Sequence, residues 1–300
     1  MPPFKRRLIQ ISLLFLSMPV WVMADHPIEV QRKSARGEHF EALVLYDRLA
    51  QRNMTPDARL AAAKSAWALG LVDKAVAEFD HLIVQDELTT YEQGRIHLMR
   101  SILEYQEQRY QVSTLYAERA VKALSAGTLR GKAWLVWGDS LQELGKNGDA
   151  QEKYTKAIEE LVVDERPEAY YRMGLNLLRL GKSTEAQAAF ENVPLGHART
   201  PSTIRELARI ALDNEEFDNA AFWLARGRSD YPDHFLDSWV DYALIRIGQE
   251  QGELKKVREM QKQVQEKYPP SDSWLTLLLA SSEVFEWKTF FGKEILNDRQ

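Results

Sequence analysis

The sequence predicts an all-α fold in which helix-turn-helix units stack into a right-handed α-solenoid. One observation is a set of paired amphipathic segments, each about a dozen residues long, and a second is their recurrence along most of the 300 residues. The third is the lack of an alternating strand pattern or a Gly/Ser linker that would divide the array. One such hairpin cannot bury its apolar face alone, so neighbouring units are expected to form a continuous core.

The clearest pair of helices is predicted at residues 132–157. The first helix carries apolar side chains three and four residues apart, which share one helical face: Trp134, Trp137 and Leu141. Gly138 lies on that face, where a second helix would pack. Gly145 stands where a left-handed C-cap ends the first helix. The second helix continues the pattern with Ala150, Tyr154 and Ala157. Small residues opposite large aromatic ones are typical of a closely crossed antiparallel hairpin.

This pattern resembles the tetratricopeptide repeat, a helix-turn-helix unit of 34 residues. With Gly131 as position 1, the signature positions 4, 7, 8, 11, 15, 20, 24 and 27 hold Trp134, Trp137, Gly138, Leu141, Gly145, Ala150, Tyr154 and Ala157. Similar units start at Pro56, about Gly94, Pro167, Pro201 and Ser238. The last unit departs from the pattern, with Val257 where alanine is expected and Gln261 where an aromatic residue is expected. The resemblance implies a single solenoid over residues 25–270, with about six repeats and an N-terminal half repeat.

Residues 1–24 have the parts of a secretory signal peptide. A basic start at Lys5, Arg6 and Arg7 precedes the apolar run Leu8–Val22, and cleavage is predicted after about Ala24. The apolar run is shorter than the ~20 residues that a membrane-spanning helix needs. We therefore expect an exported, periplasmic protein with no membrane span after cleavage.

Composition disfavours several classes of function. The formal net charge is −5, and binding to nucleic acid needs basic surface that releases counterions from phosphates. The chain has no cysteine, which excludes disulfides, thiolate metal sites and a cysteine nucleophile. The six histidines lack metal-ligand spacing, and no glycine-rich phosphate-binding motif occurs. The sequence therefore predicts no enzymatic activity, metal or cofactor. The alternative is an active site assembled from Asp139, Glu143 and Arg172.

The resemblance also implies a binding surface, because selected first-helix positions of such repeats line a groove that holds a partner peptide or helix. Those positions gather basic and aromatic side chains, namely Lys132, Tyr171, Arg172, Arg179, Arg205, Arg209, Trp239, Tyr242 and Arg246. Arginine forks suit carboxylates and stack on rings, so an acidic or C-terminal segment is the expected ligand. Alternatively, these arginines pair internally with Glu206, Asp213 and Glu250. The family's lysine/asparagine carboxylate clamp is missing, so chaperone-tail recognition is not implied.

Residues 271–300 are predicted to form capping helices that are rich in aromatic side chains, including Trp274, Phe285, Trp287, Phe290 and Phe291. They either close the solenoid or provide a surface for docking and self-association. The predicted function is that of an exported protein–protein interaction scaffold or adaptor in a bacterial envelope assembly: secretion, pilus, outer-membrane biogenesis or polysaccharide export. The alternatives are a structural component that self-associates through its tail and a solenoid that binds anionic polysaccharide.

Overall fold

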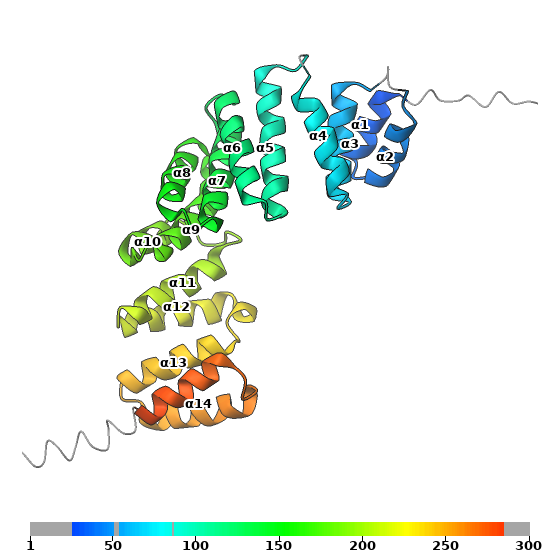
Figure 1. Cartoon of the computed structure of the whole chain (residues 1–300). Coiled ribbons are helices and arrows are strands. Elements are labelled where there is room, and N and C mark those ends of the chain that lie inside the picture. The colour runs from blue at the N-terminus through cyan, green and yellow to red at the C-terminus, as the bar shows by residue number, and fades with distance from the viewer. Residues whose placement is uncertain (1–25, 51–53, 86, 285–300) are drawn as a thin grey trace, which may run out of the picture. The chain divides into compact units, whose positions relative to one another are not determined.

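The computed structural model describes residues 26–50, 54–85 and 87–284 (Figure 1). The secondary structure of these residues is helical, and they contain no strand. The predicted leader and the aromatic residues from Phe285 onward lie outside the described residues. Within the described ranges, none of the helices combines the length and the apolar composition that crossing a membrane requires.

The chain divides into two compact units, residues 1–96 and 97–300, and the division falls within α5 (Thr90–Gln106). The sequence predicts one array over residues 25–270. In the first unit, α1 and α2 pack against each other and against α3, which pairs with α4. The bounds of these helices are α1 Pro27–Ala35, α2 His39–Arg48, α3 Pro56–Ala68 and α4 Val72–Ile83. Alanines on α3 are fully buried and allow this close packing: Ala58, Ala62, Ala63 and Ala66.

The second unit continues as helical hairpins, in which each helix packs mainly against its neighbours along the chain. Its helices are α6 (Tyr110–Ala123), α7 (Thr128–Glu143), α8 (Asn147–Glu160), α9 (Arg166–Arg179), α10 (Ser183–Glu191), α11 (Thr200–Asp213), α12 (Phe217–Asp230), α13 (Ser238–Glu250) and α14 (Leu254–Lys267). Short 3-10 turns, η2 (Val163–Glu165) and η3 (Pro232–His234), precede α9 and α13. A further helix covers residues 273–284. The prediction of an all-α helical repeat solenoid is confirmed.

Glycines set how closely the paired helices approach. A Cβ atom placed on Gly138 would lie 2.8 Å from Cε1 of Tyr154, and one on Gly174 would lie 2.6 Å from Cε1 of Phe190. The prediction that Gly138 faces the second helix of its hairpin is therefore confirmed. Any side chain at these positions would force the helices apart or displace a ring that is fully buried.

The turns inside the hairpins need a left-handed residue. Gly145 takes this conformation with φ of 73°, as predicted from its position. Gln108 and Glu215 occupy the equivalent position in two less regular repeats and take the same conformation, with φ of 58° and 61°. The fold therefore imposes the turn even where the sequence provides no glycine, at an energetic cost to the backbone.

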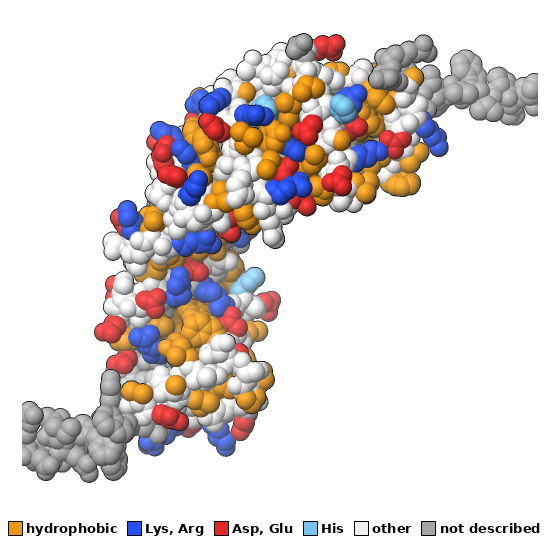
Figure 2. Space-filling model, in the orientation of Figure 1, with side chains coloured by type: hydrophobic (Ala, Val, Ile, Leu, Met, Phe, Trp, Pro, Cys, Tyr) orange, Lys and Arg blue, Asp and Glu red, His pale blue; other side chains and the backbone are white. Residues whose placement is uncertain are grey.

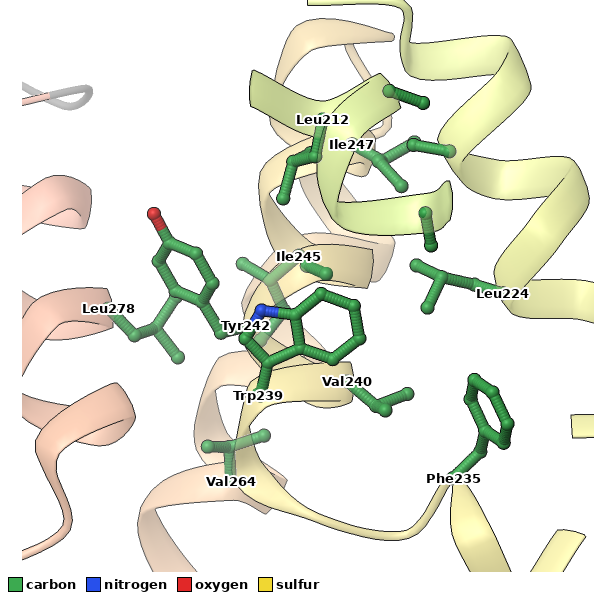
Figure 3. Close-up of a cluster of buried hydrophobic side chains, with 14 of the residues drawn as sticks. Leu212, Leu224, Phe235, Trp239, Val240, Tyr242, Ile245, Ile247, Val264 and Leu278 are labelled. Atoms are coloured by element: carbon green, nitrogen blue, oxygen red, sulfur yellow. The ribbon is translucent and has the colours of Figure 1, made fainter. Parts of the chain in front are cut away.

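The helix at residues 273–284 closes the second unit. Leu275 and Leu278 are buried in the same hydrophobic cluster as Trp239 and Tyr242 of α13. Figure 3 shows Leu278 beside Tyr242 within this cluster. The described part of the tail therefore packs on α13, although Trp274 and Leu277 stay partly exposed.

Candidate functional site

Two pockets lie along the first helices of the second unit, and together they contain six of the nine predicted groove residues. The first pocket has a volume of about 330 Å³ and lies between α7, α9 and the start of α11. Its lining includes Tyr171, Arg172 and Arg179 from the prediction, together with Tyr105, Asp139, Gln142, Glu143, Leu175 and Arg199. It is a polar pocket with three guanidinium groups.

A network of hydrogen bonds holds the arginines of this first pocket. The Tyr154 hydroxyl donates to Oδ1 of Asp139 at 3.0 Å, and Oδ2 of the same carboxylate pairs with Arg172. The amide nitrogen of Gln142 donates to the Tyr154 hydroxyl oxygen at 2.6 Å, so the amide oxygen can accept from Nε of Arg179 at 3.2 Å. The buried core ring of the α7–α8 hairpin therefore orients two arginines of the pocket.

Glu168 links Arg172 to a second arginine of the first pocket. It accepts from Nε of Arg172 at 2.8 Å and from Nε and Nη2 of Arg199 at 2.7 and 2.9 Å. The Arg199 guanidinium also lies 5.1 Å from the centre of the Tyr171 ring. Burial lowers the pKa of Arg172 and raises that of Tyr154, because each charged form loses hydration.

The second pocket has a volume of about 380 Å³ and lies between α11, α13 and the start of the helix at 273–284. It is lined by Arg205, Glu206, Arg209, Asp237, Ser238, Trp239 and Trp274. Over α11 to α13, Figure 2 shows hydrophobic side chains surrounded by basic and acidic ones. This pocket also contains two arginine–carboxylate pairs, but its two indoles make it more apolar than the first.

The arginines of the second pocket are also paired. Arg205 contacts Oδ2 of Asp237 at 2.8 Å and donates to the backbone oxygen of His234 at 2.6 Å. Arg209 contacts Oε2 of Glu206 at 2.6 Å. All of these ion pairs are partly exposed, so each contributes only about 0–1 kcal/mol.

The other predicted residues are placed differently. Lys132 pairs with Glu165 at 2.7 Å and lines neither pocket. Arg246 is half-buried and forms no ion pair with the described residues. Trp239 and Tyr242 were predicted as groove residues, but they are only 6% and 9% exposed and offer little contact area. Their rings are covered because the closing helix packs against α13.

Internal pairing of the arginines occurs, but mostly with other acids than the sequence indicated. Glu206 pairs with Arg209 as that alternative proposed, whereas Asp213 and Glu250 form no ion pair within the described ranges. The partners that sequence reasoning missed are Glu168 and Asp237, whereas Asp139 and Glu143 were named in the catalytic alternative. Glu168 occupies position 2 of its repeat, a groove position, so the repeat register contained a signal for it.

The alternative active-site residues Asp139, Glu143 and Arg172 do share the first pocket. The Asp139 carboxylate, however, is already held by Arg172 and the Tyr154 hydroxyl. Among the described residues, no group of His, Asp and Glu is arranged to hold a metal ion. What this arrangement can do is present fixed guanidinium groups and rings to another molecule.

The fold and the two pockets define a helical repeat scaffold for protein interaction. Residues 60–127 and 135–192 match the model of the tetratricopeptide repeat family, so these two regions are tetratricopeptide repeats. None of the curated proteins matches the sequence.

Two solved structures resemble the chain over most of its length. PilF of Pseudomonas aeruginosa is 15% identical, with a TM-score of 0.60 over 75% of this chain and 97% of PilF. PilW, described as a widely conserved type IV pilus biogenesis factor, is also 15% identical, with a TM-score of 0.57 over 76% of this chain and 99% of PilW. At this level of identity the likeness shows the shared fold alone.

Proposed function

We propose that this chain is an exported adaptor that holds a segment of a partner protein along the first helices of its second unit. The observation that carries the proposal is the pair of pockets on successive first helices, which bring together the predicted arginines and aromatic residues. The partner-binding residues are Tyr171, Arg172 and Arg179 in the first pocket, and Arg205, Arg209 and Trp239 in the second. Lys132 and Arg246 extend the same surface in the repeat register, whereas the Tyr242 ring is buried behind it.

The paired arginines are compatible with binding. Arg179 contacts Glu143 only at 3.7 Å, and Arg209 is 41% exposed although it contacts Glu206. Exposed pairs of this kind stabilise the fold by about 0–1 kcal/mol, so a partner group can displace the internal carboxylate at little cost. Burial beneath a partner strengthens the attraction within the new contact, because the local dielectric constant falls, and desolvation of the charged groups offsets part of this gain.

The leader and the structural likeness support a proposal for the cellular role. Residues 1–24 have the features of an export signal, and two of the solved structures that share the fold are PilF and a type IV pilus biogenesis factor. We place the chain in an envelope assembly of the pilus type, in the periplasm. Secretion, outer-membrane biogenesis and polysaccharide export remain the other assemblies in which a scaffold of this kind would act.

The proposal is tested by photo-crosslinking in the native host. A benzoylphenylalanine at Leu175, which lines the first pocket, is expected to crosslink one protein partner. The matched control is the same residue at Phe222 of α12, which is 54% exposed but lines neither pocket.

Arg205→Glu with Arg209→Glu is expected to abolish the Leu175 crosslink while the circular dichroism spectrum stays helical. Crosslinks from Phe222 alone, or capture that survives the charge reversal, would contradict the proposal. Crosslinks to a second copy of the chain would support self-association instead.

A further inference from the structure

We infer that the second pocket receives an aromatic side chain of the partner, and that Trp274 determines this specificity from outside the repeats. The inference rests on the proposed function, because it assigns ligand chemistry to one end of the same surface. It also differs from the sequence-based expectation of an acidic segment. The observations that carry it are the two indoles, the balanced charges and the anchoring of the closing helix.

The pocket has the size and lining of a site for one bulky side chain. Its volume of about 380 Å³ lies near the lower end of the range found for ligand pockets, roughly 300–1,000 Å³. Trp239 is buried in its floor, whereas Trp274 is 36% exposed and forms a wall. An inserted ring would therefore contact the apolar surface of the two indoles.

Trp274 is held in place before any partner binds. Asp272 accepts hydrogen bonds from the backbone N–H groups of Trp274 and Leu275, both at 2.9 Å, and from the Ser238 hydroxyl at 2.9 Å. The Trp274 ring packs on Tyr242 with 5.2 Å between ring centres. Leu275 and Leu278 anchor the same helix in the core. A preorganised indole loses little entropy when it contacts a ligand, which favours binding.

The charges of the second pocket do not select an acid. Its two arginines are matched by Glu206 and Asp237, so a carboxylate entering the pocket would meet no net positive charge. A ring suits this setting better than a carboxylate does. The negative face of an aromatic ring is attracted to a guanidinium group, and its apolar body replaces water on the indole.

The pocket already contains one example of this interaction. The Arg205 guanidinium lies 5.0 Å from the centre of the Trp239 ring and 5.3 Å from that of Phe235. The side chain of Arg209 is 41% exposed, and its guanidinium group is stacked on none of the described aromatic rings. A partner ring packed against Trp274 would complete a second stack of the same kind, which an aliphatic side chain cannot do.

The test uses the full mature chain and three small probes observed by saturation-transfer NMR: N-acetyl-tryptophanamide, N-acetyl-leucinamide and N-acetyl-glutamate amide. Only the tryptophan probe is expected to bind, and Trp274→Ala is expected to weaken it at least about fivefold. Leu277→Ala is the matched control, because Leu277 is 45% exposed on the same helix but does not line the pocket. Its affinity for the probe should equal that of the unaltered chain.

A second variant covers the case in which Trp274→Ala disturbs the closing helix. Arg209→Gln changes an exposed side chain of α11 and is expected to weaken the tryptophan probe about threefold without altering the circular dichroism spectrum. Equal binding of the leucine or glutamate probe, or binding unaffected by both variants, would overturn the inference. If the Leu175 crosslink to a partner persists while the tryptophan probe fails to bind, the inference fails and the proposed function stands. If the crosslink is also lost, both fail.

Discussion

The α7–α8 hairpin and the α13–α14 hairpin build the pockets beside them in different ways. In both, a glycine of the first helix faces a side chain of the second: Gly138 faces Tyr154, and a Cβ atom on Gly248 would lie 2.9 Å from Cγ2 of Val257. Tyr154 has a hydroxyl that reaches Asp139, whereas valine has no polar end. The central hairpin therefore connects its own core to the pocket in front of it. The closing hairpin has no such connection.

The closing hairpin obtains its pocket wall from beyond the repeats instead. Helix α13 is buried on several sides, with Val240, Ile245 and Ile247 all in one cluster (Figure 3). The helix at 273–284 packs on the face that a following repeat would cover and brings Trp274 to the pocket. The last repeat, which departs from the signature at Val257, is thus also the one whose pocket is lined by a residue from outside the repeats, Trp274.

Removing the anchor of the closing helix should have the largest effect. Leu278→Ala is expected to destabilise the second unit by about 2–5 kcal/mol, because it leaves a cavity at a site that is 1% exposed. Leu277→Ala, its exposed neighbour, should stay within about 0.5 kcal/mol. Hydrogen exchange of residues 273–284 measures the difference. Equal effects of the two variants would mean that this helix is not the anchor of the closing pocket.

Overpacking the central hairpin should have the next largest effect. Gly138→Leu is expected to cost roughly 1–3 kcal/mol, since the added side chain meets the Tyr154 ring. Gly148→Ala provides the control, because a Cβ atom there meets open space and alanine favours the helix. Melting temperatures should therefore move in opposite directions. An unchanged melting temperature for Gly138→Leu would show that the repeat register is wrong.

Tyr154→Phe tests the connection between core and pocket. Losing the hydroxyl should cost about 0.5–1.5 kcal/mol, because the buried Asp139 carboxylate loses a hydrogen bond. Crosslinking from Leu175 should fall, since Arg172 and Arg179 are then less well oriented. Binding of the tryptophan probe to the second pocket should not change. A parallel loss at both pockets would contradict the contrast between the two hairpins.

Acid should weaken the helix at 273–284 through protonation of Asp272, and this is the smallest of the four predicted effects. Its pKa lies below the ordinary value because the Leu275 N–H, the Ser238 hydroxyl and the Trp274 N–H bind the charged form. A lowered carboxyl pKa stabilises the fold above the unfolded value of about 3.9, and this contribution is lost as the pH falls through the folded pKa. The helix at 273–284 should fray below about pH 4. Asp272→Ala should remove that step when helicity is measured against pH.

Much of the fold could be predicted because its signals are local. The stripe of Trp134, Trp137 and Leu141, the glycine at 138 and the turn at Gly145 each act within one hairpin. Regular recurrence of that hairpin then leaves stacking as the way to bury its apolar faces. Irregular repeats were less clear, since Gln108 and Glu215 take a turn conformation that their residue types disfavour.

The sequence by itself determined the helical repeats and the side of each first helix on which the arginines lie. Only the tertiary structure decided which acids pair with them, because Asp139 and Arg172 are 33 residues apart in the chain yet share one ion pair. It also decided that Trp239 and Tyr242 are covered and that Trp274 is presented at the pocket. Periodicity places a side chain on a helix face, but burial and pairing depend on what packs against that face.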